Sequence, residues 1–261
     1  VQTCALPIYN QTEHISPALL AFAEVQYQRG NYDSALICIN QAYELDSTGH
    51  NKQNLAECYN YFGFVYEGMG EYSKALHYYE KSLTINTQID NPEGLSKNYN
   101  NIGMIYFNLG EYNTAIQHFQ KAISIDSAAK IYTDLPIMLN NIGLSFYELE
   151  QYQKALDYFN TAFNIAKSIG AVNTTSPQLN NIGLVYYKLK YYDKAISYFH
   201  KSFQIAKNNN DKTAMINELS NISSMHSKKN EYAIAEKYLD TSMQIATSAN
   251  LRVKIRGIYL S

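Results

Sequence analysis

The side chains best suited to chemistry in this chain are asparagines that return at one fixed interval along the sequence. A primary amide donates and accepts hydrogen bonds, so it can hold the backbone of another peptide whatever side chains that peptide carries. Asparagine is a poor helix former, and its return at two adjacent places in helical segments needs a reason. Either the amides bind a ligand, or they bridge neighbouring helices or were copied by duplication. The amides concerned are Asn60, Asn100, Asn101, Asn140, Asn141, Asn180, Asn181 and Asn221.

Apolar and aromatic side chains accompany these amides. At 100° per residue, positions three, four and seven residues beyond an amide lie on the same arc of a helix. Each helix is therefore predicted to present two amides beside an apolar group. Helices ~10 Å apart would each engage about three extended residues, so four such helices predict a bound segment of roughly nine to twelve residues. The accompanying side chains are Met104, Leu144, Leu184, Tyr147 and Tyr187.

The amides belong to a segment that the chain repeats. Residues 179–206 read LNNIGLVYYKLKYYDKAISYFHKSFQIA, and residues 139–166 read LNNIGLSFYELEQYQKALDYFNTAFNIA. A tyrosine marks each repeat, and an alanine follows it three places later, from Ala35 to Ala235. A fixed period of this length indicates an array of stacked units and not one compact globule. The recurring tyrosines are Tyr32, Tyr72, Tyr112, Tyr152, Tyr192 and Tyr232.

The pattern resembles the tetratricopeptide repeat. The family signature is an aromatic residue, then Leu-Gly and Tyr, then Ala-x3-Phe. The tryptophan at the first position of that signature is replaced here by tyrosine or leucine, and the closing proline is absent. The period is longer than the usual one of about 34 residues, and is similar to that of the long-helix variety found in kinesin light chains and in bacterial peptide-sensing receptors. One repeat matches the signature at Tyr99, Ile102, Gly103, Tyr106, Ala115 and Phe119.

This resemblance implies an all-α fold: a right-handed α-solenoid of stacked antiparallel helix pairs, with about six repeats and a truncated seventh. It also implies that the first helix of each pair, helix A, lines a concave groove. In peptide-binding relatives the second asparagine holds the backbone of the ligand. The resemblance implies the same role for Asn101, Asn141, Asn181 and Asn221.

The repeat frame predicts boundaries along the chain. Residues 1–8, VQTCALPI, share no periodicity with the rest and match the translation of a sequencing adapter, so we expect them to be non-native and the native N-terminus to be missing. Residues 9–16 are predicted to be a lead-in, and residues 251–261 the truncated start of a further repeat. The array between them, 17–250, is predicted to hold repeats at about 17–50, 54–90, 92–130, 135–170, 176–209 and 212–249.

Local signals predict how the helices begin, turn and pack. Ser16-Pro17, Asn91-Pro92 and Ser176-Pro177 read as an N-cap followed by proline in the first helical position. Glycines 30, 70 and 110 are expected to end helices with a positive φ, and repeats four to six place Glu150, Lys190 and Asn230 there at some cost. The glycines at 63, 103, 143 and 183 indicate that helix B passes close to helix A, with Ala115 and Ala122 as the matching small surface.

Composition and motifs argue against several classes of function. A net charge of −2 with 17% charged residues leaves no electrostatic footprint for nucleic acid. No apolar run approaches ~18 residues, so no membrane span is expected in this fragment. The histidines are scattered, and no catalytic motif, phosphate loop or metal-ligand spacing is present, so we expect no enzyme, no cofactor and no metal site. Cys38 and Cys58 are expected to be buried thiols.

These observations favour a protein–protein interaction module that binds an extended peptide or partner segment in its concave groove. The composition is typical of larger bacterial signalling proteins, in which such repeats act as a sensor. One alternative is an assembly scaffold that uses the outer helix faces; another is the regulatory fragment of an enzyme such as a histidine kinase whose catalytic domain is missing. The sequence does not indicate the ligand, the oligomeric state, or whether the compartment is cytoplasmic or periplasmic.

Overall fold

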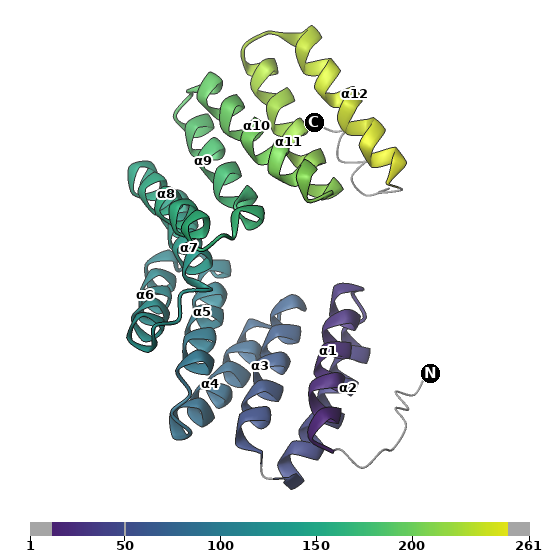
Figure 1. The fold of residues 1–261 in the computed structure, drawn as a ribbon, viewed down its shortest axis with the longest axis vertical. Coiled ribbons are helices and arrows are strands. Elements are labelled where there is room, and N and C mark those ends of the chain that lie inside the picture. The colour runs from purple at the N-terminus through teal and green to yellow at the C-terminus, as the bar shows by residue number, and fades with distance from the viewer. Residues whose placement is uncertain (1–11, 50, 250–261) are drawn as a thin grey trace. The chain divides into compact units, whose positions relative to one another are not determined.

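The computed structural model describes residues 12–49 and 51–249, in which twelve α-helices and one short 3-10 helix make up the regular structure (Figure 1). The predicted all-α fold of stacked helix pairs is thus confirmed for the part of the chain described. The predictions for residues 1–8 and 251–261 fall outside these residues. The chain divides into two compact units, of which the first ends at Tyr132 and the second begins at Thr133.

The first unit holds three helix pairs. Each pair consists of a helix A and a helix B that pack against each other, and each B helix contacts the A helix of the next pair. Successive A helices also contact one another, so they form one continuous face of the unit. The helices are α1 (Thr12–Gln28), α2 (Tyr32–Gly49), α3 (Lys52–Gly68), α4 (Tyr72–Gln88), α5 (Pro92–Asn108) and α6 (Tyr112–Ala129).

The second unit repeats the arrangement. Each of its A helices again contacts the next A helix. A short 3-10 helix at Val172–Thr174 packs against the B helix before it and the B helix after it. The helices are α7 (Leu135–Glu148), α8 (Tyr152–Ser168), α9 (Ser176–Lys188), α10 (Tyr192–Asn208), α11 (Lys212–Lys228) and α12 (Tyr232–Ser248).

Only one of the three predicted serine or asparagine caps forms. Asn91 caps α5, because its side chain accepts a hydrogen bond from the Gly94 N–H with Pro92 in the first turn. α1 begins at Thr12, earlier than predicted, and Pro17 lies inside it; the Ser16 hydroxyl donates to Asp46 of α2. Ser176 is the first residue of α9, and its hydroxyl lies 2.7 Å from that of Ser202 on α10. At both sites a partner on helix B takes the serine hydroxyl away from the capping position.

The turns between helix A and helix B follow the prediction. Gly30, Gly70 and Gly110 adopt φ values of 76°, 77° and 79°. Glu150, Lys190 and Asn230 adopt the same left-handed conformation, at 57°, 62° and 63°. A side chain in this region clashes with its own backbone, so the turns of the second unit are more strained than those of the first.

The interior of each helix pair from the second to the fifth centres on one aromatic ring. Tyr79, Phe119, Phe159 and Phe199 are fully buried and occupy corresponding positions in successive repeats. A methyl group placed on Gly143 would lie 2.6 Å from a ring carbon of Phe159, and the other three pairs show the same close approach. The helices do approach closely at these glycines, as predicted. The group that requires the space is the ring and not the alanines Ala115 and Ala122.

Candidate functional site

The predicted asparagines form hydrogen bonds between successive A helices. In the first unit Asn101 donates to the side-chain oxygen of Asn60 at 3.4 Å. In the second unit Asn181 donates to Asn140 at 2.9 Å, and Asn221 is paired with Asn180 at 3.0 Å. In each case the second asparagine of one repeat meets the first asparagine of the repeat before it. We call these three linked pairs the amide ladder.

Each link of the ladder uses only part of the hydrogen-bonding capacity of the two amides that it joins. A side-chain amide has two N–H donors and an oxygen with two acceptor sites, and one link uses one donor and one acceptor site. Asn60, Asn140 and Asn181 are nearly buried, with 6%, 9% and 8% of their surface exposed. Asn101, Asn180 and Asn221, like Asn100 and Asn141, are half-buried. The links therefore account for bridging between helices, and Asn101, Asn180 and Asn221 keep part of their surface exposed.

The predicted apolar residues of this face are half-buried between the A helices. Leu144 and Tyr147 pack against the cluster that contains Phe159 and Ile182. Burial raises the pKa of Tyr147 to about 12, so its hydroxyl is neutral and available as a hydrogen-bond donor at physiological pH. Leu184 and Tyr187 pack against the corresponding cluster one repeat later, and Met104 is also half-buried.

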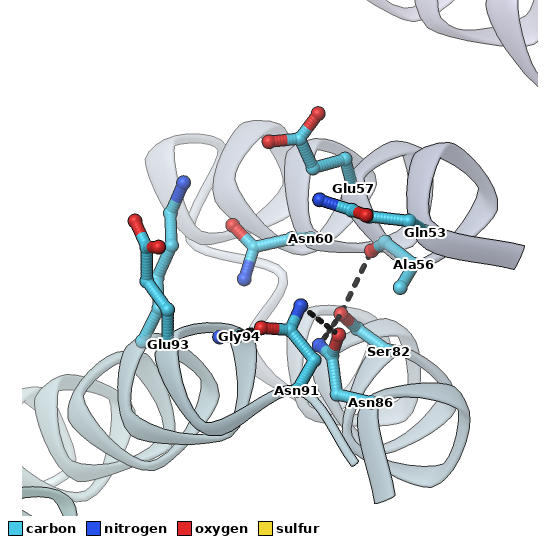
Figure 2. Close-up of a pocket in the computed structure, with 10 residues that line it drawn as sticks. Gln53, Ala56, Glu57, Asn60, Ser82, Asn86, Asn91, Glu93 and Gly94 are labelled. Atoms are coloured by element: carbon cyan, nitrogen blue, oxygen red, sulfur yellow. Dashed lines mark hydrogen bonds between the residues drawn. The ribbon is translucent and has the colours of Figure 1, made fainter. Parts of the chain in front are cut away.

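A small polar pocket opens on this face between α3 and α5, above α4 (Figure 2). We call it the Asn86 pocket; its volume is about 110 Å³. Asn86 donates to Asn98 at 2.8 Å and accepts from Asn91 at 3.0 Å, while Ser82 donates to the Ala56 carbonyl at 2.7 Å. The amides at its floor are thus bonded to one another and leave little space.

A larger pocket lies between α9 and α11 in the second unit. We call it the Glu218 pocket; its volume is about 480 Å³. Asn180 and Leu184 line it from α9, and Ala214, Glu218 and Asn221 line it from α11. A linked pair of the amide ladder and one of the predicted apolar residues therefore form its walls.

The Glu218 carboxyl is buried, with 3% of the residue exposed. Ser202 donates to its Oε1 at 2.8 Å. The Asn180 amide lies 3.2 Å from its Oε2 and presents its oxygen there; the reversed orientation would donate to Glu218 and would break the link to Asn221. Burial raises the pKa of Glu218 to about 7, against hydrogen bonds from Ser202 and Asn221 that lower it. Among the residues that the structure describes, no lysine, arginine or histidine forms an ion pair with it.

Glu218 was missed from the sequence although the repeat frame contains a signal for it. In the second to fifth repeats the corresponding position holds Cys58, Asn98, Met138 and Gln178. All four are buried in the structure. A carboxylate at a place that every other repeat fills with an apolar or neutral polar side chain indicates an unusual environment.

Metal ligands and membrane spans were sought in the same described residues. Within residues 12–49 and 51–249, no three histidine, cysteine, aspartate or glutamate side chains gather where a metal ion could be held. None of the helices described is both long and apolar enough to cross a membrane. Cys38 and Cys58 are buried thiols, as predicted, and the Sγ of Cys58 lies 3.5 Å from Asp46.

Solved structures with a similar fold include two proteins in complex with a factor or a peptide, and an ATPase with a repeat sensor. A Rap protein complexed with competence and sporulation factor matches with a TM-score of 0.70 at 15% identity, over 92% of this chain and 72% of that one. NprR in complex with its cognate peptide NprX matches with a TM-score of 0.67 at 16% identity, over 98% of this chain and 74% of that one. A signal transduction ATPase from Pyrococcus horikoshii with a tetratricopeptide repeat sensor matches with a TM-score of 0.71 at 18% identity. The match covers 97% of this chain and 40% of that one. At these identities the likeness shows the fold alone.

Sequence comparison gives the family. No curated protein sequence matches the chain. The tetratricopeptide repeat family model matches residues 15–88, 95–168 and 176–248, which covers most of the sequence. The predicted resemblance is confirmed, and the chain belongs to the tetratricopeptide repeat family.

Proposed function

We propose that this protein is an interaction module that binds an extended peptide segment along the face formed by its A helices, through the amide ladder. The observation that carries the proposal is the set of half-buried amides held at fixed places by their own hydrogen bonds. Because each amide is already oriented by a neighbour, little side-chain entropy is lost when it binds a ligand.

The chemistry of the amides fits a backbone and not a particular side chain. A peptide bond offers one donor and one acceptor, which is the complement of what a side-chain amide offers. In the second unit three A helices stand in sequence, and at ~10 Å per helix they correspond to about nine extended residues. The half-buried side chains of Leu144, Leu184 and Tyr187 beside the amides provide apolar contact for alternate side chains of such a segment.

The wider role that we propose is that of a sensor in a larger bacterial signalling protein. Three observations support it: the Rap protein and NprR, both of similar fold, were solved with competence and sporulation factor and with a cognate peptide, and the Pyrococcus horikoshii protein carries this fold as a sensor. In this role the bound peptide would be the signal.

The experiment compares peptide binding by the parent chain with two double variants, Asn60→Ala/Asn101→Ala in the first unit and Asn140→Ala/Asn181→Ala in the second. Each double variant removes both partners of a link, so no buried donor or acceptor is left alone and the folding cost is small. Nine-residue acetylated peptides from a synthetic library serve as probes. We expect at least one double variant to lose about fivefold in affinity for each ligand hydrogen bond removed.

The matched control is Asn113→Ala, an asparagine on helix B of the third repeat, away from the A-helix face. It should bind as the parent does. If both double variants bind the same peptides as tightly as the parent and the control, the ladder has no part in binding. If a double variant instead melts well below the parent, its amides serve only to bridge the helices.

A further inference from the structure

The Glu218 pocket contains a buried carboxyl group without a positive partner, and this group is ionised above its pKa of about 7. Burying an ionised carboxylate is costly unless it is paired or fully hydrogen-bonded. Ser202 and Asn221 are neutral groups, so their hydrogen bonds solvate the carboxylate but leave its charge uncompensated. A purely structural side chain at this place has no need of the charge, since Asn98 fills the equivalent site of the third repeat with a neutral amide.

The carboxylate also faces open space. The pocket volume of about 480 Å³ lies within the range of about 300–1,000 Å³ that is typical of ligand pockets. Asn180, Leu184 and Asn221 line this space together with the Glu218 carboxyl.

We propose that the Glu218 pocket is a specificity subsite that accepts a cationic side chain, arginine or lysine, of the bound peptide. The inference rests on the proposed function, because the amides that line the pocket belong to the ladder that would hold the peptide backbone. A side chain of a segment lying on Asn180 and Asn221 would enter the pocket directly. Its N–H groups would donate to the carboxylate oxygens of Glu218, and its methylene groups would contact Leu184.

A metal cation fits the site less well than an organic cation. Calcium and magnesium take six or more oxygen ligands, usually from several carboxylates. Among the described residues, Glu218 is not part of a group of three acidic, histidine or cysteine side chains. An ammonium or guanidinium group needs only two or three acceptors, which one carboxylate and a neighbouring amide oxygen provide.

The test is the selection of a synthetic library of nine-residue peptides by the parent chain, Glu218→Gln and Ala214→Leu. The peptides are acetylated, so that a terminal amine cannot take the place of a side chain. Glu218→Gln removes the charge at constant shape, and Ala214→Leu fills the pocket from its rim without a change of charge. Glu236→Gln, an exposed glutamate on α12, is the control for the net charge of the unit.

We expect peptides retained by the parent and by Glu236→Gln to carry arginine or lysine at one fixed position. Replacement of that residue by norleucine should weaken binding to the parent about tenfold or more, and should change binding to Glu218→Gln and Ala214→Leu little. Retention of peptides without a preference for a cation would overturn this inference and leave the proposed function standing. Retention of no peptide would overturn both.

Discussion

The Asn86 pocket and the Glu218 pocket lie between A helices of successive repeats, one pocket in each unit, and several of their corresponding side chains differ. Asn86, Gly94 and Asn98 in the first unit correspond to Ala206, Ala214 and Glu218 in the second. Ser82 and Ser202, which also correspond, both donate to a carbonyl of helix A, at Ala56 and Ser176. Other lining positions differ as well, and Glu93 and Lys97 correspond to Thr213 and Asn217, so the difference in volume and charge is not confined to these three positions.

The comparison shows that the pocket between two A helices can differ in volume and lining while the helices keep the same arrangement. In the first unit the Asn86 amide fills the floor and binds Asn98, and the neighbouring residue has to be glycine. In the second unit an alanine stands in place of that amide, and a carboxyl group lines the pocket. The closed contact between Asn86 and Asn98 in the first unit thus corresponds to an open pocket lined by a carboxyl group in the second.

The largest expected difference comes from adding a side chain at the rim of each pocket. A methyl group on Gly94 would lie 2.4 Å from the Asn86 amide oxygen, and that amide is held by buried hydrogen bonds. Gly94→Leu should lower the free energy of unfolding by about 1–3 kcal/mol from overpacking, and by more if the Asn86–Asn98 bond breaks. Ala214→Leu should change it by less than about 1 kcal/mol, because the pocket there is open.

Denaturant unfolding of the two variants beside the parent measures both effects. Asn86→Ala combined with Gly94→Leu provides the internal control, since removal of the amide should recover part of the loss. Equal costs for Gly94→Leu and Ala214→Leu would mean that the two pockets do not differ in the way described.

The second expected effect is a pH-dependent gain in stability from Glu218→Gln. The carboxyl titrates near pH 4.5 when the chain is unfolded and at about 7 when it is folded. Between these values the native state binds the extra proton, so stability falls as the pH rises and the penalty is complete above pH 7. Glu218→Gln should therefore be more stable than the parent at about pH 8, by on the order of 1–3 kcal/mol, and similar to it near the unfolded-state pKa.

Thermal melts of the parent and Glu218→Gln at about pH 4.5 and about pH 8 test this expectation. Asn98→Gln serves as the matched control in the first unit: any change that it causes should not depend on pH through this range, because no group that titrates there is replaced. A gain for Glu218→Gln of the same size at both pH values would show that the folded carboxyl is not perturbed.

The sequence predicted the fold well because the repeat imposes the same packing six times. The tyrosines, alanines and glycines that recur with the repeat report helix contacts that are local to one pair, so each copy supplies independent support. The caps at Ser16 and Ser176 were predicted less well, because a partner on helix B competes for each hydroxyl and the repeat period does not reveal that partner.

The candidate site was predicted only in part. The period located the amides, but it could not show that Asn181 reaches Asn140 or that Asn221 reaches Asn180. Such links depend on the distance between A helices of neighbouring repeats. Glu218 was not predicted, for the opposite reason. It departs from the repeat pattern, and recurrence does not indicate a residue that occurs only once at its position.

The measurement that tests the central claim most directly is an ester scan of a bound nine-residue peptide. Each backbone N–H of the peptide is replaced in turn by an ester oxygen, and affinity is measured for the parent chain and for both amide-ladder double variants. If the ladder holds the backbone, at least one ester should weaken binding to the parent about fivefold and have no further effect on one of the double variants. If every ester weakens the parent and the double variants equally, the amides do not contact the backbone of the ligand.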